Sequence, residues 1–94
     1  MTLVTPQSRV QCKPDVLSVE INGETVTMNV NLAEYYGLDP IASDIWQRLA
    51  QRVTVAQLVQ DLAKSYEGDP AIIQIDVLAL LDAFAAKDLL IVEA

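Results

Sequence analysis

The sequence contains no histidine, and Cys12 is its single cysteine among 94 residues. Histidine is the commonest general base and the commonest metal ligand, so its absence argues against an enzyme and against a metal site. A lone cysteine makes no internal disulfide, and no basic segment followed by an apolar stretch opens the chain. No apolar run approaches the roughly 18 residues of a membrane span. We therefore expect a cytoplasmic, non-enzymatic protein without a cofactor.

Basic residues are also scarce, since 6 Lys and Arg stand against 13 Asp and Glu, for a formal net charge of −7. Nucleic-acid affinity rests largely on Lys and Arg that neutralise phosphates, so a nucleic-acid partner is disfavoured and a basic or neutral partner is favoured. The hydrophobic fraction of 52% is too high for a disordered chain. The length fits one small domain.

Residues 1–14 are expected to be an irregular N-terminal segment, with the folded domain over residues 15–94. The stretch "VLSVEINGETVTMNV" then predicts a hairpin, because Asn22-Gly23 suits a two-residue turn. Pairing across that turn sets Leu17 opposite Met28 and Val19 opposite Val26. We expect these apolar residues to face the core. The opposite, solvated face is expected to carry Ser18, Glu20, Thr25 and Thr27.

A third short strand is predicted over 34–38, and three helices follow. Asp39-Pro40 and Asp69-Pro70 each supply an N-cap and a proline at the first helical position, and Thr54 with Gln57 forms a capping box. The final "LLIVEA" either frays or returns as an edge strand. Strands first and helices after predict an α+β fold, a small three-stranded antiparallel sheet with helices on one face.

The third helix, expected to end near Lys87, is apolar on two sides. One side docks the helix on the core and carries Ile73, Val77, Leu80, Leu81 and Phe84. The roughly opposite side carries Ile75, Leu78, Ala79, Asp82 and Ala86. Either this helix is buried on most sides, or it forms one wall of a groove that receives an apolar segment. In the second case Asp76 or Asp82 would meet a basic group at the rim.

An exposed edge of the sheet would complete such a groove. A guest peptide would pair with the third strand, and its side chains would fall alternately against the helix and into solvent. Adjacent tyrosines on a strand point to opposite faces, and we favour Tyr36 inward and Tyr35 toward the peptide. The predicted peptide-binding residues are Glu34, Tyr35, Tyr36, Gly37, Leu38, Ile75, Asp76, Leu78, Ala79 and Asp82.

The order of these motifs is similar to that of the PqqD-like RiPP recognition elements, where RiPPs are ribosomally made, post-translationally modified peptides. The resemblance covers roughly residues 15–92, over the hairpin, "YYGLDPIASDIWQRL", "TVAQLVQDLAKSY" and "DVLALLDAFAAKDLL". It implies a winged-helix-like domain of three strands and three helices without catalysis of its own. Such a domain binds the leader of a precursor peptide as an added strand between the third strand and the third helix. The matching positions are Leu38-Asp39, Ile45-Trp46, Thr54-Val55 with Leu58, and Asp76-Val77 with Leu80-Leu81.

Within this family, the segment "EYYGLDPIASDIW" most resembles the standalone leader-binding protein of lasso-peptide biosynthesis. That resemblance implies a leader peptidase as partner, with the cyclase as a further candidate. A PqqD-type chaperone of pyrroloquinoline quinone biosynthesis is the second alternative.

Two other readings of the sequence are weaker. A winged-helix DNA-binding protein would use the second and third helices, but these carry only Lys64 and Lys87 against four aspartates. An acyl carrier needs a serine at a helix start, usually within Asp-Ser-Leu. The nearest sequence is "ASDI", and its Ser43 is expected on the exposed side of the first helix. Trp46 lies on the apolar stripe of that helix, so we expect it in the core rather than at a ligand.

Overall fold

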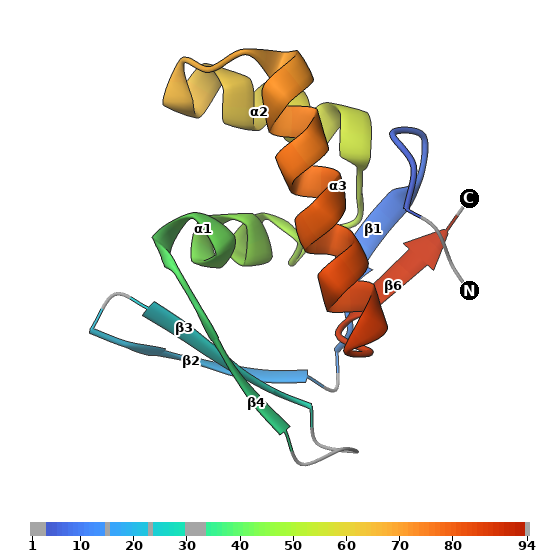
Figure 1. Ribbon diagram of the computed structural model, residues 1–94. Coiled ribbons are helices and arrows are strands. Elements are labelled where there is room, and N and C mark those ends of the chain that lie inside the picture. Colours follow the sequence, from blue (N-terminus) through green and yellow to red (C-terminus); the bar gives the residue numbers. More distant parts are fainter. Residues whose placement is uncertain (1–3, 15, 23, 30–33, 94) are drawn as a thin grey trace.

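The computed structural model describes residues 4–14, 16–22, 24–29 and 34–93. These residues form two small antiparallel sheets and three helices (Figure 1), which confirms the predicted α+β fold with a three-stranded sheet followed by three helices. The strands are β1 (Arg9–Cys12), β2 (Val16–Ile21), β3 (Glu24–Asn29), β4 (Glu34–Leu38), β5 (Val53–Thr54) and β6 (Leu90–Glu93). The helices are α1 (Pro40–Arg48), α2 (Val55–Tyr66) and α3 (Pro70–Ala86).

One sheet has the order β2-β3-β4, and a second sheet, absent from the sequence prediction, has the order β5-β1-β6. β1 lies within the segment that was expected to be irregular, whose residues 1–3 fall outside the described part of the chain. Val10 of β1 is fully buried, and β6 pairs with β1 in antiparallel register. The last apolar run is therefore an edge strand rather than a frayed end.

The helix starts follow the predicted capping signals. Asp39 Oδ1 accepts the Ala42 N–H at 2.7 Å, and Asp69 Oδ1 accepts the Ala71 N–H at 2.9 Å. Thr54 Oγ1 likewise accepts the Gln57 N–H at 3.1 Å. These side chains satisfy backbone donors that the first turn of a helix leaves open, and the cap at Asp39 fixes the point where β4 gives way to α1.

The hairpin of β2 and β3 has the predicted register, with Leu17 opposite Met28 and Val19 opposite Val26. Its faces, however, are reversed. Leu17 and Val19 are 58% and 57% exposed, whereas Thr27 is fully buried. The prediction that the apolar face packs on the core was wrong, and β3 instead turns its polar residues inward.

The reason for this reversal is that the inner face of the sheet meets the ends of two helices. Ser43 Oγ, in the first turn of α1, accepts the Thr25 N–H at 3.1 Å and donates to the Leu38 carbonyl at 3.2 Å. Asn29 Nδ2 donates to the Lys87 carbonyl at the C-cap of α3, at 3.0 Å. Helix ends carry backbone groups without intrahelical partners, so polar residues satisfy this contact better than apolar ones.

Ser43 is therefore 4% exposed, and the expectation that it lies on the exposed side of its helix was wrong. The same burial removes it as an attachment site for a carrier arm. Trp46 is buried as predicted and packs edge-to-face on Phe84, with ring centroids 5.5 Å apart. The core thus lies among the three helices and the second sheet.

Candidate functional site

β4 is an edge strand, as predicted. It pairs with β3 on one side and ends the strand order of its sheet. A Cβ built on Gly37 would meet no atom within 4 Å, so the space beside this residue is open. An open strand edge offers backbone donors and acceptors to another extended segment.

One flank of α3 lies alongside this edge. Lys87, which caps α3, places Nζ 4.6 Å from the ring centre of Tyr36 in β4. Asp39, which directly follows β4, lines the same cavity as Asp76 and Leu80 of α3. The spacing of Asp76, Leu80 and Lys87 puts them on one stripe of the helix. We call this stripe the β4 flank. It approaches β4 at Lys87, over Tyr36, and at the cavity shared with Asp39, and we call the strip between it and β4 the candidate groove.

The other predicted residues of α3 do not lie on the β4 flank. Asp82 Oδ1 accepts the N–H of Val4 from the N-terminal segment at 3.3 Å, on the side of the helix away from β4. Leu78 is half-buried and packs on the core, while Ile75 is 68% exposed and Ala79 is exposed. The structure thus places Asp76 at the same cavity as Asp39, the residue after β4, whereas Ile75, Leu78 and Asp82 do not line that cavity. The exposure of Ile75 also excludes a helix buried on most sides.

The two tyrosines of β4 point to opposite faces of the sheet. Tyr36 is half-buried under Lys87, and its hydroxyl donates to the Glu34 carboxylate. That hydrogen bond, with burial and the nearby charge, raises the pKa of Tyr36. Tyr35 is 70% exposed and lies beside Leu17 and Met28 on the outer face. The predicted inward orientation of Tyr36 is therefore confirmed.

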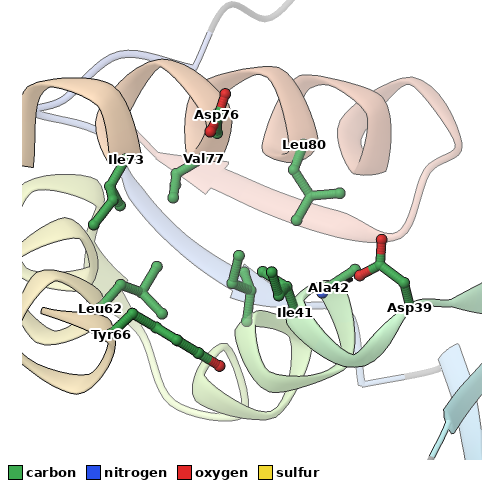
Figure 2. A pocket seen from close by; sticks show the side chains of 10 residues that line it. Asp39, Ile41, Ala42, Leu62, Tyr66, Ile73, Asp76, Val77 and Leu80 are labelled. Carbon is green, nitrogen blue, oxygen red and sulfur yellow. Dashed lines mark hydrogen bonds between the residues drawn. The ribbon is translucent and has the colours of Figure 1, made fainter. Parts of the chain in front are cut away.

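A cavity of about 330 Å³ opens between α1, α2 and α3 at the end of β4. Figure 2 shows Ile73, Val77 and Leu80 pointing from α3 toward α1 and α2. The sequence assigned these three residues to the docking side of the helix, and it gave no sign that the packing there is incomplete. The cavity is lined by Asp39, Ile41, Ala42, Ile45, Leu62, Tyr66, Ile73, Asp76, Val77 and Leu80.

A polar cluster ties α1 to α2 at this cavity. Tyr66 Oη donates to Asp44 Oδ2 at 2.5 Å, and Arg48 Nε donates to Asp44 Oδ1 at 3.0 Å. Arg48 also donates to Ser65 Oγ at 3.0 Å. Partial burial would raise the pKa of Asp44, but the hydrogen bonds from Tyr66 and Arg48 outweigh it and lower that pKa. The cluster holds the Tyr66 ring against the cavity.

In the described part of the chain, no group of three or more His, Cys, Asp or Glu residues is placed to hold a metal ion. Within the same residues, no helix is long and apolar enough to cross a membrane.

Comparison with protein families gives a match to the model described as coenzyme PQQ synthesis protein D (PqqD), over residues 24–90. The chain belongs to the PqqD family. The match begins in β3 and ends at the start of β6, so it includes β4, the β4 flank and the whole cavity. The resemblance inferred from the sequence motifs is thereby confirmed. Comparison with curated proteins finds no match.

Solved structures of RiPP recognition elements share the fold of this PqqD-family protein. TbiB1 in complex with the TbiA(beta) leader peptide is 29% identical, with a TM-score of 0.76 over 85% of this chain and 93% of that chain. The PqqD truncation of Methylobacterium extorquens PqqCD, described as a functional, stand-alone recognition element, is 26% identical, with a TM-score of 0.79 over 94% of each chain. A lasso peptide synthetase B1 complexed with its leader peptide is 22% identical, covers 87% of this chain and 96% of that chain, and shares the fold with a TM-score of 0.76.

Proposed function

We propose that this PqqD-family protein is a non-catalytic adaptor that binds the leader of a ribosomally made precursor peptide as a strand added to β4. One observation carries the proposal: β4 is an open edge strand that meets the β4 flank of α3 at Tyr36, under Lys87, and ends at the cavity lined by Asp39, Asp76 and Leu80. An extended segment placed there gains backbone hydrogen bonds from the strand and side-chain contacts from the helix. The leader complex of the 29% identical TbiB1 supports this choice of guest.

The side chains of an added strand would alternate between two environments. One set would face the helices, over Tyr36 and the β4 flank, and the other set would face outward, near Tyr35 and Gly37. Glu34 and Leu38 mark the two ends of the paired segment. An adaptor must release the leader again, so a mid-nanomolar to micromolar dissociation constant, roughly −8 to −10 kcal/mol, suits this role.

In this proposal the adaptor works in the cytoplasm and presents the leader to a leader peptidase of lasso-peptide biosynthesis, with the cyclase as a further partner. The leader complex of TbiB1 supports a leader as the guest, and the choice of the lasso pathway rests on the resemblance of the segment "EYYGLDPIASDIW". A PqqD-type chaperone of pyrroloquinoline quinone biosynthesis is the second candidate, favoured by the family match over residues 24–90. The genes beside this one distinguish the two, because only a lasso pathway places a precursor next to a transglutaminase-like peptidase and an asparagine-synthetase-like cyclase.

The groove is tested by titrating a fluorescein-labelled synthetic leader, taken from the short precursor reading frame next to the gene, with wild-type protein and two variants. Leu80→Asn puts an amide on the half-buried β4 flank, whereas Ile75→Asn makes the same change on the exposed opposite side. We expect Leu80→Asn to weaken binding by at least tenfold, because it removes apolar contact at the centre of the groove. Ile75→Asn should stay within about twofold of the wild type.

Circular dichroism of both variants controls for loss of the fold. If Ile75→Asn weakens binding and Leu80→Asn does not, the leader lies on the side of α3 that also carries Leu78 and Asp82. If folded wild-type protein binds no leader from its own gene neighbourhood, the proposed function is wrong.

A further inference from the structure

We propose that the cavity between the three helices binds one bulky apolar side chain of the leader, and that Asp39 and Asp76 at the cavity select a lysine or arginine next to that residue. This inference rests on the proposed function and adds to it the chemistry of the recognised residue pair. It concerns a cavity beyond the edge of β4, so the two proposals can fail separately.

The size and lining of the cavity set the kind of side chain that it takes. Its volume is about 330 Å³, and every lining residue other than Asp39, Tyr66 and Asp76 is apolar. A dry, apolar cavity of roughly 150 Å³ is already large enough for benzene. The cavity therefore has room for a leucine, phenylalanine or tyrosine side chain, and burial of apolar surface there favours binding.

The polar groups at the cavity differ in what they can offer a guest. The Tyr66 hydroxyl donates to Asp44, so it is turned toward α1, and Figure 2 shows this side chain lying along the cavity floor with its oxygen beside α1. Asp39 Oδ1 accepts the N–H of Ala42 in the first turn of α1. Two carboxylates, those of Asp39 and Asp76, remain as the charged groups that a guest meets.

Neither carboxylate is neutralised by the protein's own cations in the described residues. The ion pairs found there join Lys13 to Asp88, Arg48 to Asp44 and Arg52 to Glu93. Arg48 is also held by Ser65, and Lys87 lies over Tyr36 at the other end of the groove. With a net charge of −7 for the whole chain, the cavity attracts a cationic residue and repels an anionic one.

The position of the cavity also lets it fix the register of the leader strand along β4. Asp39 directly follows Leu38, the last residue of β4, so a strand added along β4 reaches the cavity as it passes this end. Backbone pairing alone leaves a strand free to slip along its partner. A bulky side chain seated in the cavity would fix which leader residue stands opposite Leu38.

The test uses capped pentapeptides rather than a leader. The probe Thr-Lys-Phe-Thr-Thr is compared with three relatives in which Lys becomes Gln, Lys becomes Glu, or Phe becomes Ser. Methyl NMR of the full chain follows Ile73, Val77 and Leu80, which line the cavity. We expect the Lys-Phe probe to shift these methyl signals, the Gln probe to bind two- to fivefold more weakly, the Glu probe more weakly still, and the Ser probe not to shift them.

Variants of the protein test the carboxylates directly. Asp39→Asn keeps a good N-cap, and Asp76→Asn changes an exposed helical position, so both variants should fold. Each is expected to lower the preference for Lys over Gln by about two- to fivefold. Glu20→Gln on β2 is the matched control, because it removes the same charge from an exposed strand of the hairpin and should leave the preference unchanged.

If no probe shifts the cavity methyl groups while the leader still binds along β4, the cavity inference is wrong and the adaptor function stands. Equal binding of the Lys and Glu probes would overturn the role of the two aspartates. If the probes behave as expected but the leader does not bind, the proposed function fails instead.

Discussion

Ser43 shows how much a single buried hydroxyl contributes to the site. It joins the first turn of α1 to both neighbouring strands, through the Thr25 N–H and the Leu38 carbonyl. It therefore holds β4 in place below the cavity. In the sequence, Ser43 is an ordinary polar position of an amphipathic helix. Its role in joining helix to sheet depends on Thr25, a partner 18 residues earlier in the chain.

We predict that Ser43→Ala lowers the free energy of unfolding by about 1–3 kcal/mol, because it leaves the buried Thr25 N–H without its acceptor. Ser18→Ala, at an exposed position of β2, should change it by less than about 0.5 kcal/mol. Urea denaturation of both variants measures the difference. Equal effects at the two positions would show that the hydroxyl of Ser43 does not stabilise the sheet.

Asp44 makes stability depend on pH at the same helix. Its pKa is lowered in the folded state because hydrogen bonds from Tyr66 and Arg48 outweigh its desolvation. A carboxyl with a lowered folded pKa stabilises the protein above its unfolded pKa, and this stabilisation is lost as the pH falls through the folded value.

We predict that wild type and Asp44→Asn differ in free energy of unfolding near neutral pH. The difference should start to shrink as the pH falls to about 4, near the unfolded pKa, and should be lost only below the lowered folded pKa of Asp44. Urea denaturation from pH 7 down through the range in which aspartate titrates measures the difference. A difference that is constant over this range would contradict the assigned hydrogen bonds.

At the scale of elements, the sequence of the hairpin determines its strand register but not which of its two faces packs on the core. The Asn22-Gly23 turn predicts the register of β2 and β3, because a two-residue loop leaves one pairing. Alternation tells which residues share a face, but not which face is packed. The polar face packs inward because it forms hydrogen bonds with the ends of α1 and α3, which lie far along the chain.

We predict that Leu17→Thr and Val19→Thr, on the exposed face, each change the free energy of unfolding by less than about 0.5 kcal/mol. Leu81→Ala in the core should cost about 2–5 kcal/mol, because Leu81 is fully buried. Thermal or urea unfolding checks the contrast. A large loss at Leu17 or Val19 would mean that the hairpin packs with its apolar face inward after all.

Local sequence patterns likewise do not determine which flank of α3 faces β4, or that β1 pairs with β6. Periodicity identified a helix with more apolar surface than one core needs, and the edge position of β4 followed from the strand count. Which flank of α3 faces β4 depends on the tertiary contacts of Asp39, Leu80 and Lys87. The pairing of β1 with β6 joins segments from opposite ends of the chain, and four-residue strands give little periodic signal.

At the scale of the whole molecule, the motif pattern was sufficient to place the chain in its family, since the match over residues 24–90 includes the three motifs after the hairpin and the second strand of the hairpin. The acidic charge acts at this scale too. With a net charge of −7, the protein attracts a basic leader over a distance comparable to the Debye length.

We predict that raising the salt concentration weakens binding of a leader with a basic residue beside its apolar anchor, mainly through a slower association rate. Asp76→Asn should make this salt dependence shallower, whereas Glu20→Gln, which lies on β2, should change it less. Stopped-flow fluorescence at several salt concentrations measures the rates. Identical salt dependence in all three proteins would contradict a local role for Asp76.

The central claim, that a leader adds to the sheet beside α3, is tested most directly by amide hydrogen exchange of β4 with and without the bound leader. In an antiparallel edge strand, alternate N–H groups point away from the sheet and have no partner strand. We predict that the leader slows exchange at every second residue of Glu34–Leu38, while the amides already bonded to β3 change little. A leader that binds and leaves the exchange of all the β4 amides unchanged would contradict the account.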